Sequence, residues 1–73
     1  MTIEEMKNLK VDDTVKDVAR SKKHDREILC TVESIDEYSV TLVALFAKDA
    51  SSYPHRFFFN RDADVLEKAS ISS

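Results

Sequence analysis

The sequence predicts an all-β domain, a five-stranded small barrel with a short N-terminal helix. Apolar and polar residues alternate over several short segments, and polar, turn-forming residues separate these segments. The chain has 73 residues, which is enough for a single domain over 1-73 and one modest core. Because a chain this short buries only about 60% of its unfolded surface, we expect marginal stability.

The elements are expected in a simple order. Thr2 and Glu5 fit a capping box at the start of a helix over residues 3-9, although a loosely ordered arm is the alternative. A strand over 14-20 and a polar loop over 21-26 should follow. The clearest strands are "EILCTVESI" and "SVTLVALF", joined in a hairpin through Asp36 and Glu37. The loop "AKDASSYPH", the strand "RFFFN", a helical turn at "NRDAD" and a strand over 65-68 complete the domain, and the tail 70-73 should fray.

The chain contains no glycine. Phosphate-cradling loops and dinucleotide-binding turns need glycine for close approach of the backbone, so both kinds of site are excluded. Any left-handed backbone position must instead use Asp or Asn, the next most tolerant residues. The candidates are Asp13, Asp25, Asp36 and Asn60.

Catalytic and metal-binding chemistry is not expected. Cys30 lies in the middle of an apolar strand, which favours a small core side chain over a nucleophile. His24 and His55 fall in separate loops without the spacing of metal ligands, although His24 could join an anion-binding patch at low pH. We therefore expect no enzyme activity and no cofactor.

We expect the protein to be cytoplasmic. The N-terminal segment is acidic where a secretory signal would be basic, and no apolar run is long enough to cross a membrane. Domains with a small core commonly gain stability from a disulfide, a metal or oligomerisation, and a single cysteine excludes an internal disulfide. Self-association or binding to a protein partner remains as the source of additional stability. No membrane partner is expected.

Positive charge is concentrated in the predicted loop after the first strand. Arg20, Lys22, Lys23 and Arg26 oppose only Asp25 there. Arg56 and Arg61 would extend this basic patch if the barrel brings the loops together. Three interpretations stay open: a solvated loop tip, a docking site for an acidic protein, and a nucleic-acid site, although the isoelectric point of about 5.2 is low for the last.

The strands carry more apolar residues than one core needs. The alternation places the following set inside: Ile28, Cys30, Val32, Val40, Leu42, Ala44, Phe46, Phe57 and Phe59. Leu29, Val43, Leu45 and Phe58 then point outward, with Tyr53 as a further aromatic anchor. Either the N-terminal helix packs Ile3, Met6 and Leu9 over this outer set, or a strong bend lets both faces of a strand meet the core, or the set is an interface for a second copy or another protein.

Two segments resemble a known family. "VESIDEYSVTL" (residues 32-42) resembles the hydrophobic-x-x-aromatic-Asp hairpin of the Sm-like proteins, a subgroup of the SH3-like small barrels, and "NRDADVL" (60-66) is similar to their closing Arg-Gly segment. The resemblance implies the barrel fold and single-stranded RNA binding, for which Arg56, Arg61 and the basic loop would supply the contacts, with Phe58 available for base stacking. However, Val40 stands where the family has a base-binding asparagine, and Asp62 stands where it has glycine.

The sequence therefore favours a non-catalytic protein-binding module that self-associates as a homodimer or higher oligomer. A compact acidic chain without catalytic residues would suit a small phage or mobile-element accessory protein that inhibits a host enzyme. Nucleic-acid binding of the Sm-like or SH3-like kind is the alternative.

Overall fold

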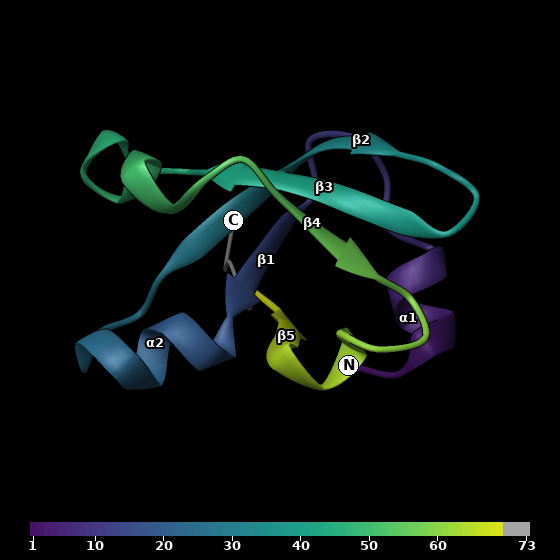
Figure 1. Ribbon diagram of the computed structural model, residues 1–73, viewed down its shortest axis with the longest axis horizontal. Helices are drawn as coiled ribbons and strands as arrows, with labels where there is room; N and C mark the ends of the chain where they lie inside the picture. Colours follow the sequence, from purple (N-terminus) through teal and green to yellow (C-terminus); the bar gives the residue numbers. More distant parts are fainter. Residues whose placement is uncertain (70–73) are drawn as a thin grey trace.

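One curled antiparallel sheet forms most of the molecule. The computed structural model describes residues 1-69 and contains five strands in the order β4-β3-β2-β1-β5 (Figure 1). The strands are β1 (Thr14–Asp17), β2 (Leu29–Ile35), β3 (Ser39–Ala44), β4 (His55–Phe58) and β5 (Leu66–Lys68). The sheet bends into a half-barrel, so the expectation of a small β-rich fold is confirmed.

Four short helical segments connect or flank the strands. They are α1 (Ile3–Lys7), α2 (Val18–His24) and the 3-10 turns η1 (Ala47–Ser52) and η2 (Ala63–Val65). At the start of α1 the Thr2 hydroxyl accepts from the Glu5 amide at 3.1 Å, and the Glu5 carboxylate accepts from the Thr2 amide at 2.9 Å. This capping box satisfies two backbone donors that the helix itself leaves unpaired.

The β2-β3 hairpin forms where the sequence predicts it, and Asp36 holds its turn. The Asp36 carboxylate accepts from the Tyr38 and Ser39 amides at 2.8 and 2.7 Å and from the Ser39 hydroxyl at 2.8 Å. These hydrogen bonds stabilise the ionised form and lower the pKa of Asp36. A bulge between Val32 and Ser34 shifts the register next to this turn.

The core fills the concave side of the sheet. It contains residues from all five strands and the segments beside them: Met6, Leu9, Val15, Ile28, Cys30, Val32, Val40, Leu42, Phe57, Phe59, Ala63 and Leu66. Met6 is fully buried and Leu9 nearly so in this same cluster. The N-terminal helix therefore closes the core, and the interpretation that its apolar residues cover the outer face is wrong.

The predicted strand over 14-20 ends at Asp17, and the predicted loop over 21-26 is largely the helix α2. The Asp17 carboxylate accepts from the Arg20 amide at 3.0 Å and thereby caps the helix N-terminus. Asp25 ends the helix in a left-handed conformation at φ 53°, with its amide directed to the last carbonyls. These two caps outweigh the strand preference of Val18.

Other local expectations need correction. Of the four candidates for a left-handed backbone, Asp25 takes this conformation, whereas Asp13, Asp36 and Asn60 do not. The other residue with a positive φ among those described is Asp12, at φ 77°. The polar loop after β3 folds into η1. Ala44 is only partly buried, and Phe46 is 49% exposed, because β3 ends before Phe46 and the chain turns away from the core. The expected frayed tail, 70-73, lies outside the described residues.

At each edge of the sheet, some outward-facing backbone groups are paired within the protein. At β4, the Phe58 amide donates to the Asp62 carboxylate at 2.8 Å, and the Phe58 carbonyl accepts from the Arg61 and Asp62 amides. At β5, the amino group of Met1 donates to the carbonyls of Ala63 and Leu66 at 3.2 and 2.6 Å. Backbone groups already paired in this way are not available to another strand.

Candidate interaction surfaces

The convex face of the sheet carries its apolar residues in rows that the strand register defines. Leu45 lies opposite Leu29, since the Leu45 amide donates to the Leu29 carbonyl at 3.1 Å, and Val43 lies opposite Thr31 in the next row. Leu45 is 40% exposed, and Leu29 and Val43 are half-buried. These three residues form one contiguous patch, called the outer patch below.

Charged residues flank the outer patch. Lys16 on β1 lies opposite Leu29 and, on its other side, opposite Glu67 of β5. Arg56 on β4 lies opposite Thr41, one row beyond Val43. The arrangement, an apolar centre within a polar border, is the one that protein interfaces show.

Phe58 is separate from the outer patch. It pairs with Ser39 at the other end of the face, and the row of Arg56 and Thr41 lies between Phe58 and Val43. The Arg61 guanidinium lies 4.8 Å from the centre of the Phe58 ring, so a cation-π contact covers the ring from within the same molecule. The prediction that Phe58 shares one surface with Leu29, Val43 and Leu45 is therefore only partly right.

Tyr53 lies on the opposite side of the sheet from the outer patch. It packs against the core, and its hydroxyl donates to the buried Asp17 carboxylate at 2.7 Å. Burial, together with Cys30 and Asp17, raises the pKa of Tyr53 well above its ordinary value. Tyr53 is thus tied to the core and to Asp17, and the structure does not bring it together with the other predicted interface residues on the convex face.

The predicted basic patch is divided between separate parts of the molecule. α2 lies at the opposite end of the view in Figure 1 from the turn that follows β4, which contains Arg61. Three of the arginines have carboxylate partners: Arg20 with Asp17 at 3.0 Å, Arg26 with Asp49, and Arg61 with Asp62 at 3.2 Å. Lys22 and Lys23 are exposed on α2, and Arg56 is exposed on β4.

The two positions at which the sequence departs from the Sm-like pattern are occupied by structural residues. Val40 is fully buried in the core. Burial disfavours the ionised form of the Asp62 carboxyl group and tends to raise its pKa. Hydrogen bonds from the Phe58 amide and from Arg61 outweigh the effect of burial, so the pKa of Asp62 is lowered. Asp62 therefore places a negative charge directly beside Arg61.

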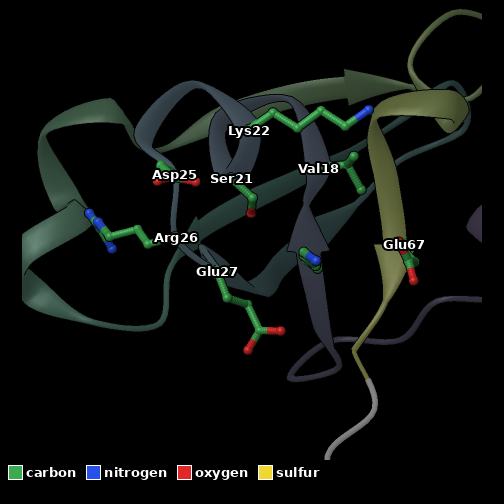
Figure 2. A pocket seen from close by; sticks show the side chains of 8 residues that line it. Val18, Ser21, Lys22, Asp25, Arg26, Glu27 and Glu67 are labelled. Carbon is green, nitrogen blue, oxygen red and sulfur yellow. The ribbon is translucent and has the colours of Figure 1, made fainter.

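An open depression lies between α2 and the β1-β5 edge. Figure 2 shows its lining, which includes Val18, Ser21 and Lys22 from α2 and Glu67 from β5. Ser21 is buried, and its hydroxyl donates to the Asp17 carbonyl at 2.6 Å and accepts from the Ile28 amide at 2.9 Å. Side chains of both charges line the depression, so it favours neither an anionic nor a cationic ligand.

A smaller cavity of about 80 Å³ separates α2 from η1. It is lined by Arg20 and His24 of α2, by Lys48, Asp49, Ser51 and Ser52 of η1, and by Arg26, Ile28 and Tyr53. Sequence reasoning identified Arg20, His24 and Arg26 but missed the η1 residues. Asp49 lies 23 positions from its partner Arg26, and no local motif indicates such a pairing.

The remaining titratable candidates are one buried thiol and two exposed histidines. Burial raises the pKa of Cys30 to about 11, which keeps the thiol protonated at neutral pH. Both histidines are exposed, and the centres of the His55 and Phe57 rings lie 4.8 Å apart in an edge-to-face arrangement. Within residues 1-69 there is no group of three metal-ligating side chains. No helix in that range has the length and apolar character needed to span a membrane.

Comparison of the chain with family models, with curated proteins and with solved structures gave no match.

Proposed function

We propose that this chain is a protein-binding module built on an SH3-like small barrel. The strand order β4-β3-β2-β1-β5 and the 3-10 turn directly before the last strand support this barrel type. Within the class, the chain acts without catalysis and associates with itself or with a second protein.

The observation that carries the proposal is the outer patch. Leu29, Val43 and Leu45 lie together on the face of the sheet that the core does not use, and α1 packs on the other side. Burying such residues removes apolar surface from water, which is the main favourable term in protein association. The charged residues at the border, Lys16, Glu67 and Arg56, would then set the orientation of the partner.

Self-association would use this face rather than a strand edge. The backbone groups of Phe58 and Leu66 at the two edges already have intramolecular partners. A second copy that adds a strand at Phe58 or Leu66 would have to displace these partners, whereas a face-to-face contact displaces only water.

Sedimentation velocity over a range of concentrations tests the self-association. We expect the wild type to dimerise as concentration rises and Leu45→Ser to remain a monomer. Ile3→Ser is the matched control, because Ile3 is similarly exposed at 45% but belongs to α1, and this variant should still dimerise. A wild type that stays monomeric at all concentrations contradicts the self-association.

Capture of partners from a host lysate tests binding to a different protein. A module without catalysis acts by occupying a surface of its partner, so we extend the proposal to a small phage or mobile-element accessory protein that inhibits a host enzyme. Wild type and Ile3→Ser should retain the same protein, Leu45→Ser should not, and the captured enzyme should lose activity on addition of the wild type. Equal capture by Leu45→Ser would rule out the outer patch as the binding surface.

Titration with labelled single-stranded RNA at two salt concentrations separates this proposal from the nucleic-acid alternative. Electrostatic binding to RNA weakens steeply with salt. Since Arg61 is paired with Asp62 and stacked on Phe58, we expect little binding even at low salt. Salt-sensitive binding that Arg61→Ala abolishes would favour the RNA-binding class instead.

A further inference from the structure

The outer patch has a charge of opposite sign at each of its two ends along the strand direction. Leu29 and Leu45 form its first row, and Val43 lies in the next row. Glu27 precedes Leu29 by two residues, so it lies on the same face just beyond the first row. Arg56 lies on this face one row beyond Val43. The patch therefore has a carboxylate at one end and a guanidinium at the other.

The placement of Glu27 follows from the pairing of the chain just before β2. The Asp17 amide donates to the Ile28 carbonyl at 3.0 Å, so the chain is already paired with β1 at Ile28. Ile28 is buried in the core, and strand alternation directs its neighbours Glu27 and Leu29 to the convex face. Figure 2 shows Glu27 at the depression that Glu67 of the same face also lines.

Both charges are available to a partner. Glu27 and Arg56 are exposed, and within residues 1-69 neither of them forms an ion pair. Glu27 lies on the segment that enters β2 and Arg56 lies on β4, so the two charges flank β3, which carries Val43 and Leu45. Neighbouring strands of a curled sheet curve away from one another less than its outermost strands do. Both charges therefore stay close to the surface on which the patch lies.

A second copy of the chain complements this arrangement. In a two-fold symmetric dimer the same surface of both copies forms the contact. An axis that lies between the two faces and crosses β3 between Val43 and Leu45 reverses the strand direction of one copy relative to the other. Val43 then meets the leucine row of the partner, and Glu27 lies over the end that carries Arg56 of the partner subunit. An axis parallel to the strands would instead bring identical ends together and place like charges beside one another.

We propose that the outer patch binds a second copy of the chain about a two-fold axis that crosses β3, with Glu27 of each copy paired with Arg56 of the partner subunit. This inference rests on the proposed self-association and adds its orientation. Exposed ion pairs contribute little affinity, so burial of the leucine and valine side chains drives the contact. The two equivalent ion pairs select the reversed arrangement over the parallel one.

Charge reversal in two separate variants, followed by mixing, tests the orientation. Glu27→Lys and Arg56→Glu each place like charges together twice in their own homodimer, so each alone should dimerise roughly tenfold more weakly than the wild type. In an equal mixture, every heterodimer of the two variants contains two pairs of opposite charge, so the affinity should return close to that of the wild type. Sedimentation equilibrium at low ionic strength, where exposed charges are screened least, measures these affinities.

Matched charge reversals on α1 serve as controls. Glu4 and Lys7 are exposed on this helix, which packs on the other side of the sheet from the outer patch. Glu4→Lys and Lys7→Glu, alone and mixed, should therefore dimerise like the wild type. Raising the salt concentration should reduce the difference between the wild type and Glu27→Lys, because screening weakens both the attraction and the repulsion.

The possible failures of this inference and of the proposed self-association are distinguishable. A wild type that dimerises, together with wild-type affinity in Glu27→Lys and Arg56→Glu or no recovery in their mixture, overturns the orientation alone. A wild type that is monomeric at every concentration overturns the self-association and this inference with it. Capture of a lysate protein that Leu45→Ser fails to retain would then make a different protein the occupant of the outer patch.

Discussion

Asp17 is the most deeply buried acidic residue of the molecule, and every contact to its carboxylate comes from a donor. The Arg20 amide and Nη1 each donate at 3.0 Å, and the Tyr53 hydroxyl donates at 2.7 Å. One side chain thus ends β1, caps α2 and joins α2 to the segment after η1. A buried charge with this many partners is tolerated because its lone pairs are satisfied.

Tyr53→Phe tests how much the hydrogen bond to Asp17 contributes to stability. The variant keeps the ring but removes one donor from Asp17, so we expect the free energy of unfolding to fall by about 1–2 kcal/mol. Chemical denaturation measures the change. Tyr38→Phe is the control. Because Tyr38 is 70% exposed, loss of its hydroxyl group should change the free energy of unfolding little. Equal effects of both variants would contradict the role of the Asp17 contact.

Cys30 provides a second residue-scale prediction. Its thiol is fully buried, with a pKa raised from 9.0 to about 11, so at pH 8 the folded protein should react very slowly with thiol reagents. Unfolding should restore ordinary reactivity. Since the folded state holds this proton more tightly, the stability contributed by Cys30 is present below pH 9 and is lost as the pH rises towards 11. Rapid labelling under native conditions would show that the thiol is accessible.

At the scale of elements, the five-residue helix α1 contributes a fully buried side chain to the core. Met6 is fully buried in the core, whereas Ile3 on the same helix is 45% exposed. We expect Met6→Ala to cost about 2–5 kcal/mol, which is a large part of the stability of a domain of this size. Thermal unfolding measures the loss. Ile3→Ala should be nearly neutral, and a comparable loss in both would indicate damage to the helix rather than to the core.

The edge of β4 gives another prediction at this scale. Asp62→Ala removes the acceptor of the Phe58 amide and one partner of Arg61, so we expect destabilisation of about 1 kcal/mol. Amide exchange at Phe58 should also become faster. Asp64→Ala serves as the control because Asp64 is exposed in the neighbouring 3-10 turn. No change in exchange at Phe58 would show that this hydrogen bond does not protect the edge.

Elements with a local signal could be predicted from the sequence, and those fixed by distant contacts could not. Alternation and the Asp36 turn predict the β2-β3 hairpin, and these features are local. The sequence indicates Asp25 as a left-handed candidate but gives no separate signal for Asp17 as a cap, and strand-forming Val15 and Val18 favour a longer strand instead. The pairing of Arg26 with Asp49 depends on how α2 and η1 pack, which no short window of sequence contains.

At the scale of the whole molecule, carboxylates stabilised in the folded state determine the response to acid. The pKa values of Glu5, Asp36, Asp49 and Asp62 are all lowered, chiefly by hydrogen bonds from amides or arginine. Their contribution is therefore present at neutral pH and is lost as the pH falls below the ordinary values of about 4. We expect the unfolding temperature to drop steeply below this pH. Asp36→Asn should reduce that drop, while Glu37→Gln, one position away and exposed, should not.

The order of strands in the sheet has a consequence for how the molecule assembles. β2, β3 and β4 pair with their neighbours in sequence, but β5 pairs with β1 from the other end of the domain. Closing such a long loop costs more chain entropy than closing a hairpin, so the β2-β3-β4 meander should form early and β5 should dock last. The same three-residue strand, held by β1 and by the amino group of Met1, should then be the first to open. In pulse-labelling hydrogen exchange, protection should appear in the meander before it appears in Leu66–Lys68.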